Sequence, residues 1–206
     1  MDTRAKRTQV SHFIIIVPHR DSLKPVEEYR TQLFTAGVCG ALSFPVCAPL
    51  ACVSRPFSRL ELKELAANIL SRAAKTGGKL QTSTAAFARC PLAGYFFGPR
   101  LDLAIPEAAI PETAREKVLC AYAPPVLCAA LVDSSEDRAF GQAPVVSFRA
   151  AFLTNLSVRP LPGADTQYSF EWRMGGPVWF ARGGGFTACY PAPCTSCQSP
   201  APQARR

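Results

Sequence analysis

The sequence predicts an α+β fold in which two clear helices stand among many short strands. Hydrophobic residues make up 48% of the 206-residue chain, which is enough for a packed core. Apolar residues at helical spacing follow the first β-branched run, and a second helix start follows the next extended segment. Beyond residue 126, β-rich segments crowd together between turn-forming residues. A chain of this length can form one large domain or two compact lobes.

The first part of the chain reads as strand, helix and extended segment. Residues 13–17 are a β-branched run typical of a buried strand. Apolar positions at helical spacing predict a helix over residues 23–36. Residues 42–53 are mostly apolar and predict an extended segment, in which Pro45 and Pro49 have to lie at an edge or a bulge.

A capping box marks the start of the second helix. The Ser58 hydroxyl and the Glu61 carboxylate, three residues apart, can each accept a free backbone N–H at a helix start. An apolar stripe over residues 62–73 continues this helix. Residues 79–89 and 95–105 follow as two extended runs and predict a hairpin.

The second half is richer in strands. Pro111 and Glu112 predict a shorter helix that ends near Cys120. Strands are predicted over residues 126–132, 145–158, 167–173 and 178–181. These elements divide the chain into a flexible N-terminus (1–10), a folded body (11–182, with lobes over 11–105 and 106–182) and a low-complexity tail (183–206).

Composition indicates the cellular compartment and the kind of partner to expect. The apolar stretch at residues 13–17 is far shorter than a membrane span or a secretory signal, so neither is predicted. Nine cysteines form an odd set without an export signal, which favours reduced thiols in the cytoplasm. The net charge of +8 would attract phosphate-rich partners. Much of that charge lies in the termini, at Arg4, Lys6, Arg7, Arg205 and Arg206.

Four segments give the chain a family resemblance. Residues 12–18 look like a first strand, 27–37 like a first helix, and 43–50 and 123–128 like two motif strands. In this layout the chain resembles the 2H phosphoesterase superfamily, the two-histidine cyclic phosphodiesterases and RNA ligase-like (LigT-like) proteins, over residues 11–182. The resemblance implies two pseudo-duplicated lobes with antiparallel sheets around a central cleft.

In that family, two His-x-Thr motifs place their side chains on one face of each motif strand, because alternate residues of a strand point the same way. The two imidazoles serve as general base and general acid, and the hydroxyls hold the phosphate. The resemblance puts Cys47 and Pro49 at the first motif, and Pro125 and Leu127 at the second. Both motifs are therefore degenerate, and no catalytic residue is predicted.

The chain's two histidines cannot replace the missing pair. His12 and His19 are the only histidines and lie at the two ends of one predicted strand. Seven extended residues span roughly 23 Å, and an odd separation turns the two side chains to opposite faces. One phosphate cannot contact both imidazoles.

We therefore expect a catalytically inactive 2H phosphoesterase-like protein, a pseudoenzyme that acts as a binding or interaction module. The alternative is a 2′,3′-cyclic phosphodiesterase-type hydrolase of RNA or nucleotides that uses non-standard residues. Loss of the polar groups predicts that the cleft takes an apolar ligand or a protein segment. Nucleic-acid binding, if present, would be weak and carried by the basic termini.

Other chemistries have weaker support in the sequence. Arg55, Arg149 and Arg173 are candidates for binding an anion, with solvated arginine as the alternative. Cys47 is either a buried core residue or a reactive thiol. Three tail cysteines without a fourth ligand make an incomplete zinc site, so no metal or cofactor is predicted; they are Cys189, Cys194 and Cys197.

Overall fold

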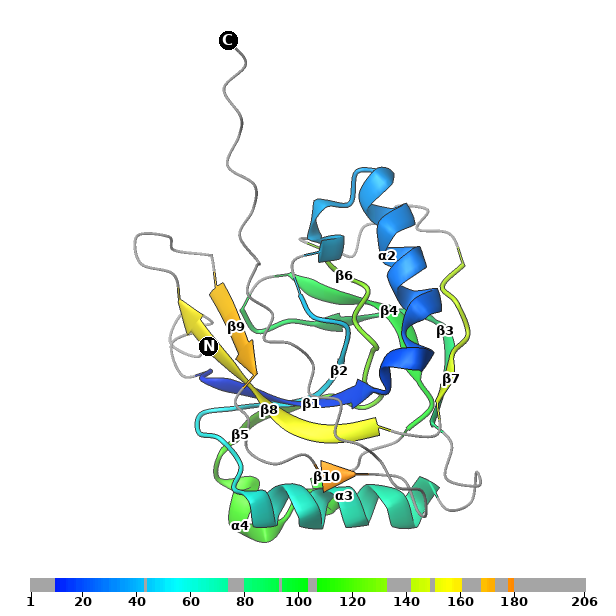
Figure 1. The fold of residues 1–206 in the computed structure, drawn as a ribbon. Helices are drawn as coiled ribbons and strands as arrows, with labels where there is room; N and C mark the ends of the chain where they lie inside the picture. The colour runs from blue at the N-terminus through cyan, green and yellow to red at the C-terminus, as the bar shows by residue number, and fades with distance from the viewer. Residues whose placement is uncertain are drawn as a thin grey trace.

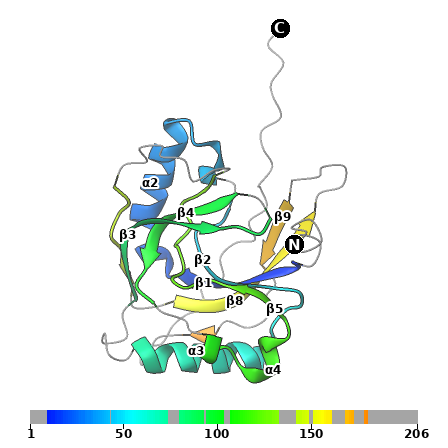
Figure 2. The same cartoon turned by 180° about the vertical axis from the view of Figure 1, so that it is seen from behind.

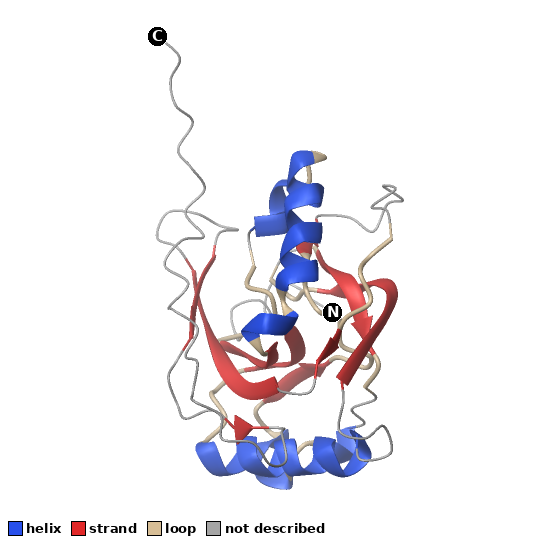
Figure 3. Cartoon of the chain, turned by 45° about the vertical axis from the view of Figure 1, so that its right-hand side comes forward, coloured by secondary structure: helices blue, strands red, loops and turns tan. Residues whose placement is uncertain are grey.

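The computed structural model describes residues 10–42, 44–73, 80–92, 94–103, 107–132, 142–148, 151–160, 168–172 and 178–179. These residues form an α+β body with two antiparallel sheets and few helices, as predicted (Figures 1 and 3). Among the described residues, no helix is long and apolar enough to cross a membrane. The predicted C-terminal tail lies outside the described residues.

The larger sheet has six strands. Its order is β10-β8-β1-β2-β5, and β9 also pairs with β8. Every pairing in it is antiparallel. The strands are β1 (His12–Pro18), β2 (Ala48–Val53), β5 (Val118–Ala121), β8 (Ala151–Pro160), β9 (Tyr168–Trp172) and β10 (Val178–Trp179).

The smaller sheet has four strands in the order β6-β4-β3-β7. The predicted hairpin forms its centre, as β3 (Leu80–Arg89) and β4 (Tyr95–Leu101), and Figure 2 shows it from behind. β6 (Ala130–Val132) and β7 (Ser147–Phe148) flank the hairpin. Each sheet thus combines strands from before and after residue 105, so the expected lobe boundary there does not separate the two sheets.

Helices cover the sheets from two sides. α3 (Arg59–Ala73) and α4 (Glu112–Arg115) lie along the six-stranded sheet, whereas α2 (Lys24–Thr35) lies by the four-stranded sheet (Figure 1). Tyr29 of α2 contacts Phe97 of β4, with ring centroids 6.4 Å apart. Three short 3₁₀ turns complete the helical elements of the described residues: η1 (Arg20–Ser22), η2 (Cys39–Leu42) and η4 (Glu107–Ala109).

The central strand β1 is buried on both faces, as its β-branched sequence predicts. Ile14 and Ile16 join the larger apolar cluster, which includes the buried stripe of α3. On the opposite face, Phe13 packs edge-to-face against Phe44 and Phe96 in a second cluster between the sheets. Burial of both faces fixes the position of β1 and of its neighbours β2 and β8.

The predicted helix from Pro111 to Cys120 is wrong in its extent. α4 spans only Glu112–Arg115, and β5 begins at Val118. Residues of β5 pair with β2, with Ala121 opposite Ala51 and Cys120 opposite Cys52. Cross-strand pairing thus determines the conformation of a segment whose local signals favoured a helix.

Of the predicted extended segment 42–53, only Ala48–Val53 is a strand, and η2 occupies Cys39–Leu42. The β1–β2 register shifts where Pro49 pairs with Ile15 and Ala51 pairs with Ile14. Pro49 therefore lies at a bulge, as the sequence predicts for a proline that cannot donate to a ladder.

Candidate functional site

The side chains at the four expected motif positions are buried. Cys47 and Leu127 are 0% exposed, and Pro49 and Pro125 are also buried. They belong to the packed interior of the two-sheet body, so they do not line a surface that is open to a ligand.

The two motif segments nevertheless lie side by side. The backbone N–H of Cys128 donates to the Cys47 carbonyl at 2.9 Å. On its other side the second segment follows β4, because the Leu127 N–H donates to the Pro99 carbonyl at 2.9 Å. This segment therefore links the start of β2 to the four-stranded sheet.

A glycine makes this close approach possible. A Cβ on Gly98 of β4 would overlap the Leu127 carbonyl oxygen and lie 2.8 Å from the Ala129 nitrogen.

Of the strand predicted over residues 126–132, only Ala130–Val132 is a regular strand, and Val126 makes an isolated bridge to Arg100.

The two histidines lie at opposite ends of β1. His12 is 7% exposed, and its Nδ1 lies 2.8 Å from the Ser11 hydroxyl oxygen. His19 follows the strand, and its Nδ1 lies 3.2 Å from the exposed Asp21 carboxylate. The structure does not bring the two imidazoles to one site.

Of the three candidate anion-binding arginines, only Arg55 is among the described residues. It is exposed in the loop between β2 and α3. Arg149 and Arg173 lie outside the described residues, as do the tail cysteines Cys189, Cys194 and Cys197.

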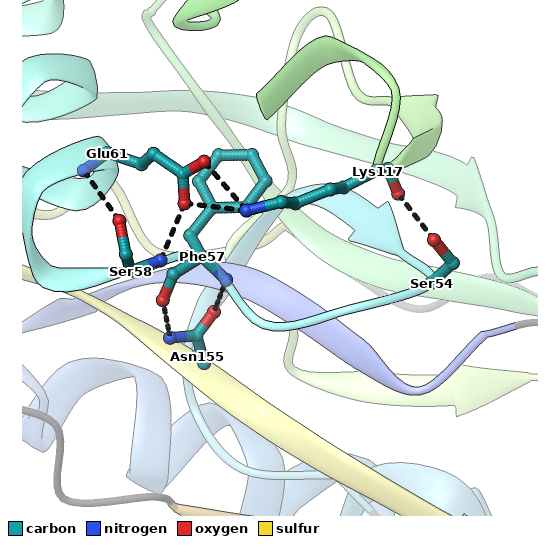
Figure 4. Close-up of polar contacts among 6 residues, drawn as sticks. All are labelled: Ser54, Phe57, Ser58, Glu61, Lys117 and Asn155. Atoms are coloured by element: carbon teal, nitrogen blue, oxygen red, sulfur yellow. Dashed lines mark hydrogen bonds and ion pairs between the residues drawn. The ribbon is translucent and has the colours of Figure 1, made fainter. Parts of the chain in front are cut away.

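The start of α3 carries the clearest polar cluster (Figure 4). The predicted capping box forms, since the Ser58 N–H donates to Glu61 Oε2 at 2.6 Å and the Glu61 N–H donates to Ser58 Oγ at 3.3 Å. Lys117 Nζ donates to both Glu61 carboxylate oxygens, at 2.7 and 2.9 Å. Burial raises the pKa of Glu61, but the bonds from Lys117 and Ser58 outweigh burial and lower it overall.

This cluster connects four elements. The Lys117 carbonyl before β5 accepts the Ser54 N–H at 2.9 Å and the Ser54 hydroxyl at 3.3 Å. Asn155 of β8 bonds to the backbone of Phe57 in the same loop. The Glu61 carboxylate is thus occupied by protein donors, and the cluster acts as a clamp between α3 and the six-stranded sheet.

A pair of thiols that sequence reasoning missed lies across two neighbouring strands of that sheet. Cys52 of β2 and Cys120 of β5 are directly opposite each other. Among the described residues, no group of three or more His, Cys, Asp or Glu side chains could hold a metal ion. Five described cysteines are outside any disulfide: Cys120 is exposed, and the others are buried, namely Cys47, Cys52, Cys90 and Cys128.

The buried thiols of Cys47 and Cys128 are expected to be unreactive. Burial raises the pKa of Cys47 well above its ordinary value, and the neighbouring Cys128 adds to the rise while Arg30 opposes it. Burial also raises the pKa of the Cys128 thiol. The thiolate is the reactive form of cysteine, and a raised pKa makes it rare. Cys47 is therefore better interpreted as a core residue than as a nucleophile.

A buried tyrosine lies beside the thiols. Tyr122 is 6% exposed, and its hydroxyl has no hydrogen-bond partner within the described part of the chain. Burial raises its pKa well above the ordinary value, and Cys52, Cys90 and Cys120 add to the rise. This buried hydroxyl is therefore a hydrogen-bond donor that lies near the thiols.

Comparison with known proteins returns no match, whether to a family model, to a curated protein or to a solved structure. The chemistry of the residues described above is therefore the basis for proposing a function.

Proposed function

We propose that this chain is a catalytically inactive 2H phosphoesterase-like protein that acts as a binding or interaction module. The observation that carries the proposal is the burial of Cys47, Pro49, Pro125 and Leu127. An active two-histidine site would need imidazoles and hydroxyls at these positions, facing a phosphate. Here the positions hold one thiol and three apolar side chains, all buried inside the body.

Backbone donors do not replace the lost side chains. Proline has no N–H, and the N–H groups of Leu127 and Cys128 already donate to carbonyls of the protein. An anion held here would lose its water without gaining hydrogen bonds, at a cost of several kcal/mol. This supports a partner that is not recognised through a phosphate at the motif positions.

The partner we propose is an apolar ligand or, in preference, a protein segment that binds on the surface. The side chains at the motif positions are buried, so we place the binding surface elsewhere on the body. Four large apolar side chains among the described residues are exposed, on separate elements, and each is a candidate contact for such a segment; they are Phe34, Leu60, Phe87 and Val145.

The experiment titrates a labelled short RNA with a 2′,3′-cyclic phosphate end into the full chain at two salt concentrations. A variant with Gln at Arg4, Lys6 and Arg7 removes three N-terminal charges. A matched control with Gln at the exposed Arg55, Arg59 and Lys63 removes three charges from the body. We expect weak binding that falls steeply with salt and falls further in the N-terminal variant.

Tight binding that resists salt and is unchanged in the N-terminal variant would contradict the proposal. If the control variant alone lost binding, an anion site at Arg55 and the alternative nucleotide-directed function would be favoured instead.

A further inference from the structure

We propose that Cys52 and Cys120 form a peroxide-sensitive dithiol that closes to a disulfide across β2 and β5. The inference is independent of the proposed binding function. It starts from strand register, since the two cysteines are direct partners in the antiparallel β2–β5 ladder. Direct partners have Cα atoms about 4.5–5.5 Å apart, within the range of about 4.4–6.8 Å that a disulfide spans.

The side chains meet as well as the backbones. The Cys52 thiol is in hydrogen-bond contact with the Cys120 thiol, and this contact together with burial raises the pKa of Cys52 well above its ordinary value. Cys52 therefore stays a protonated thiol that does not react with peroxide itself, and it reacts only once Cys120 has been oxidised. Neither cysteine is part of a disulfide in this structure. Because facing residues of paired strands share one side of the sheet, the two sulfurs lie on the same side of the β2–β5 ladder.

The two thiols differ in access. β5 is the last strand of the sheet path, and Cys120 is exposed there. Cys52 is 1% exposed. An oxidant in solution therefore reaches Cys120 first, and Cys52 is the second thiol that attacks the oxidised one.

The reaction balances with hydrogen peroxide as the oxidant. The Cys120 thiolate attacks one peroxide oxygen, the O–O bond breaks, and hydroxide leaves and takes up the thiol proton as water. Cys120 is now a sulfenic acid. The Cys52 sulfur then attacks the Cys120 sulfur, the S–O bond breaks, and the hydroxyl leaves with the Cys52 proton as a second water. In total, two thiols lose two electrons and two protons, and one peroxide becomes two waters.

Tyr122 supplies a second observation at the same place. It follows the last residue of β5, two residues after Cys120, and its N–H donates to the Leu50 carbonyl at 2.7 Å. Its buried hydroxyl has no hydrogen-bond partner in the described part of the chain. A sulfenic oxygen on Cys120 would give this hydroxyl an acceptor, which assigns Tyr122 as a positioning residue for the oxidised state.

The other described thiols provide internal controls. Cys47 and Cys128 are both 0% exposed, so peroxide cannot reach either without opening the body. Cys90 is 5% exposed and near Cys52, so it is the competing partner. The proposal predicts that Cys120, and not Cys90, is linked to Cys52.

The test treats the reduced full chain with one equivalent of hydrogen peroxide, then unfolds it in denaturant and blocks the remaining thiols, buried ones included, with N-ethylmaleimide. Tryptic peptides are then identified by mass spectrometry without reduction. We expect one dominant cross-link, between the peptides of Cys52 and Cys120, that disappears on reduction. We also expect the thermal unfolding midpoint to rise by about 5–10 °C on oxidation and to return on reduction.

Variants separate the roles. C120S, at an exposed edge, should abolish the cross-link and leave Cys52 reduced, whereas C90S should leave the cross-link intact. C52S, or C52A if C52S is unstable, should leave Cys120 as a sulfenic acid that dimedone traps. Y122F keeps the ring and should slow cross-linking several-fold.

A Cys52 that stays fully available to N-ethylmaleimide after oxidation of Cys120 would overturn the proposal. A dominant link from Cys52 to Cys90, or one that persists in C120S, would do the same. An unchanged rate in Y122F would overturn the role given to Tyr122.

Discussion

The side-chain amide of Asn155 bonds to both backbone polar groups of Phe57, although the two residues lie 98 positions apart in the chain. Asn155 Oδ1 accepts the Phe57 N–H at 2.8 Å, and Asn155 Nδ2 donates to the Phe57 carbonyl at 3.0 Å. Asn155 is 7% exposed. This pair attaches the loop before α3 to β8, directly ahead of the first residue of the helix.

Replacing Asn155 with Ala should lower the free energy of unfolding by about 2–4 kcal/mol, because two buried backbone groups lose their partner. Denaturant unfolding measures this change. Asn68→Ala is the matched control, since Asn68 makes a single bond to the Ala109 carbonyl and is half-buried; we expect a loss of about 1 kcal/mol there. Equal losses in the two variants would contradict the anchoring role of Asn155.

The Glu61–Lys117 pair should make stability depend on pH. The folded-state pKa of Glu61 lies below its ordinary value of 4.5, so the charged carboxylate stabilises the fold above that pH. The contribution is lost as pH falls through the lowered folded pKa. Glu61→Gln should therefore be less stable than the parent at pH 7, by about 1–3 kcal/mol, and the difference should shrink below about pH 4.

Unfolding curves between pH 3 and pH 7 provide the measurement for Glu61→Gln. Glu64→Gln, at an exposed position of the same helix, is the control and should follow the parent at every pH. A deficit of Glu61→Gln that is constant across this range would show that the carboxylate charge contributes nothing.

Gly98→Ala should be severely destabilising, by about 3 kcal/mol or more, because the new methyl group meets backbone atoms of residues 127 and 129 that cannot move aside cheaply. Gly37→Ala is the comparison. Gly37 has a φ of +91° but no atom within 4 Å of an added Cβ, so its cost is conformational, about 1 kcal/mol. Chemical denaturation measures the loss of unfolding free energy in each variant. Equal losses in Gly98→Ala and Gly37→Ala would contradict the close approach of the second motif segment to β4.

Native-state alkylation should separate the cysteines by burial. With iodoacetamide and site-by-site mass spectrometry, Cys120 should react quickly, whereas Cys47 and Cys128 should react only as fast as the protein unfolds. Raising denaturant should accelerate Cys47 and Cys128 together. A Cys47 that is modified as fast as Cys120 would indicate that the motif region is open to solvent.

Local signals predicted much of the fold. The β-branched run gave β1, helical spacing gave α2, and Ser58 with Glu61 marked the start of α3, because each of these depends on neighbours within a few residues. Pro49 was expected at a bulge and lies at one. The helix expected up to Cys120 failed because pairing with β2, far away in the sequence, decides the conformation of β5.

The candidate sites were harder to predict, for the same reason. No spacing rule brings Cys52 opposite Cys120, since their contact depends on strand order and register. Likewise, the sequence indicates the acceptor role of Glu61 in the capping box but not its partner Lys117, which comes from the turn after α4. The sequence did indicate that His12 and His19 could not act together, because they are its only histidines and lie at opposite ends of the predicted strand; in the structure His12 begins β1 and His19 follows it.

Turnover of a 2′,3′-cyclic nucleotide tests the central claim most directly. The full chain is assayed beside His12→Gln and His19→Gln, which remove the only imidazoles in the sequence. We expect the parent and both variants to give the rate of the buffer blank, because the motif positions hold no acid or base. Turnover well above the blank in the parent, lost in either histidine variant, would contradict the proposed inactive module.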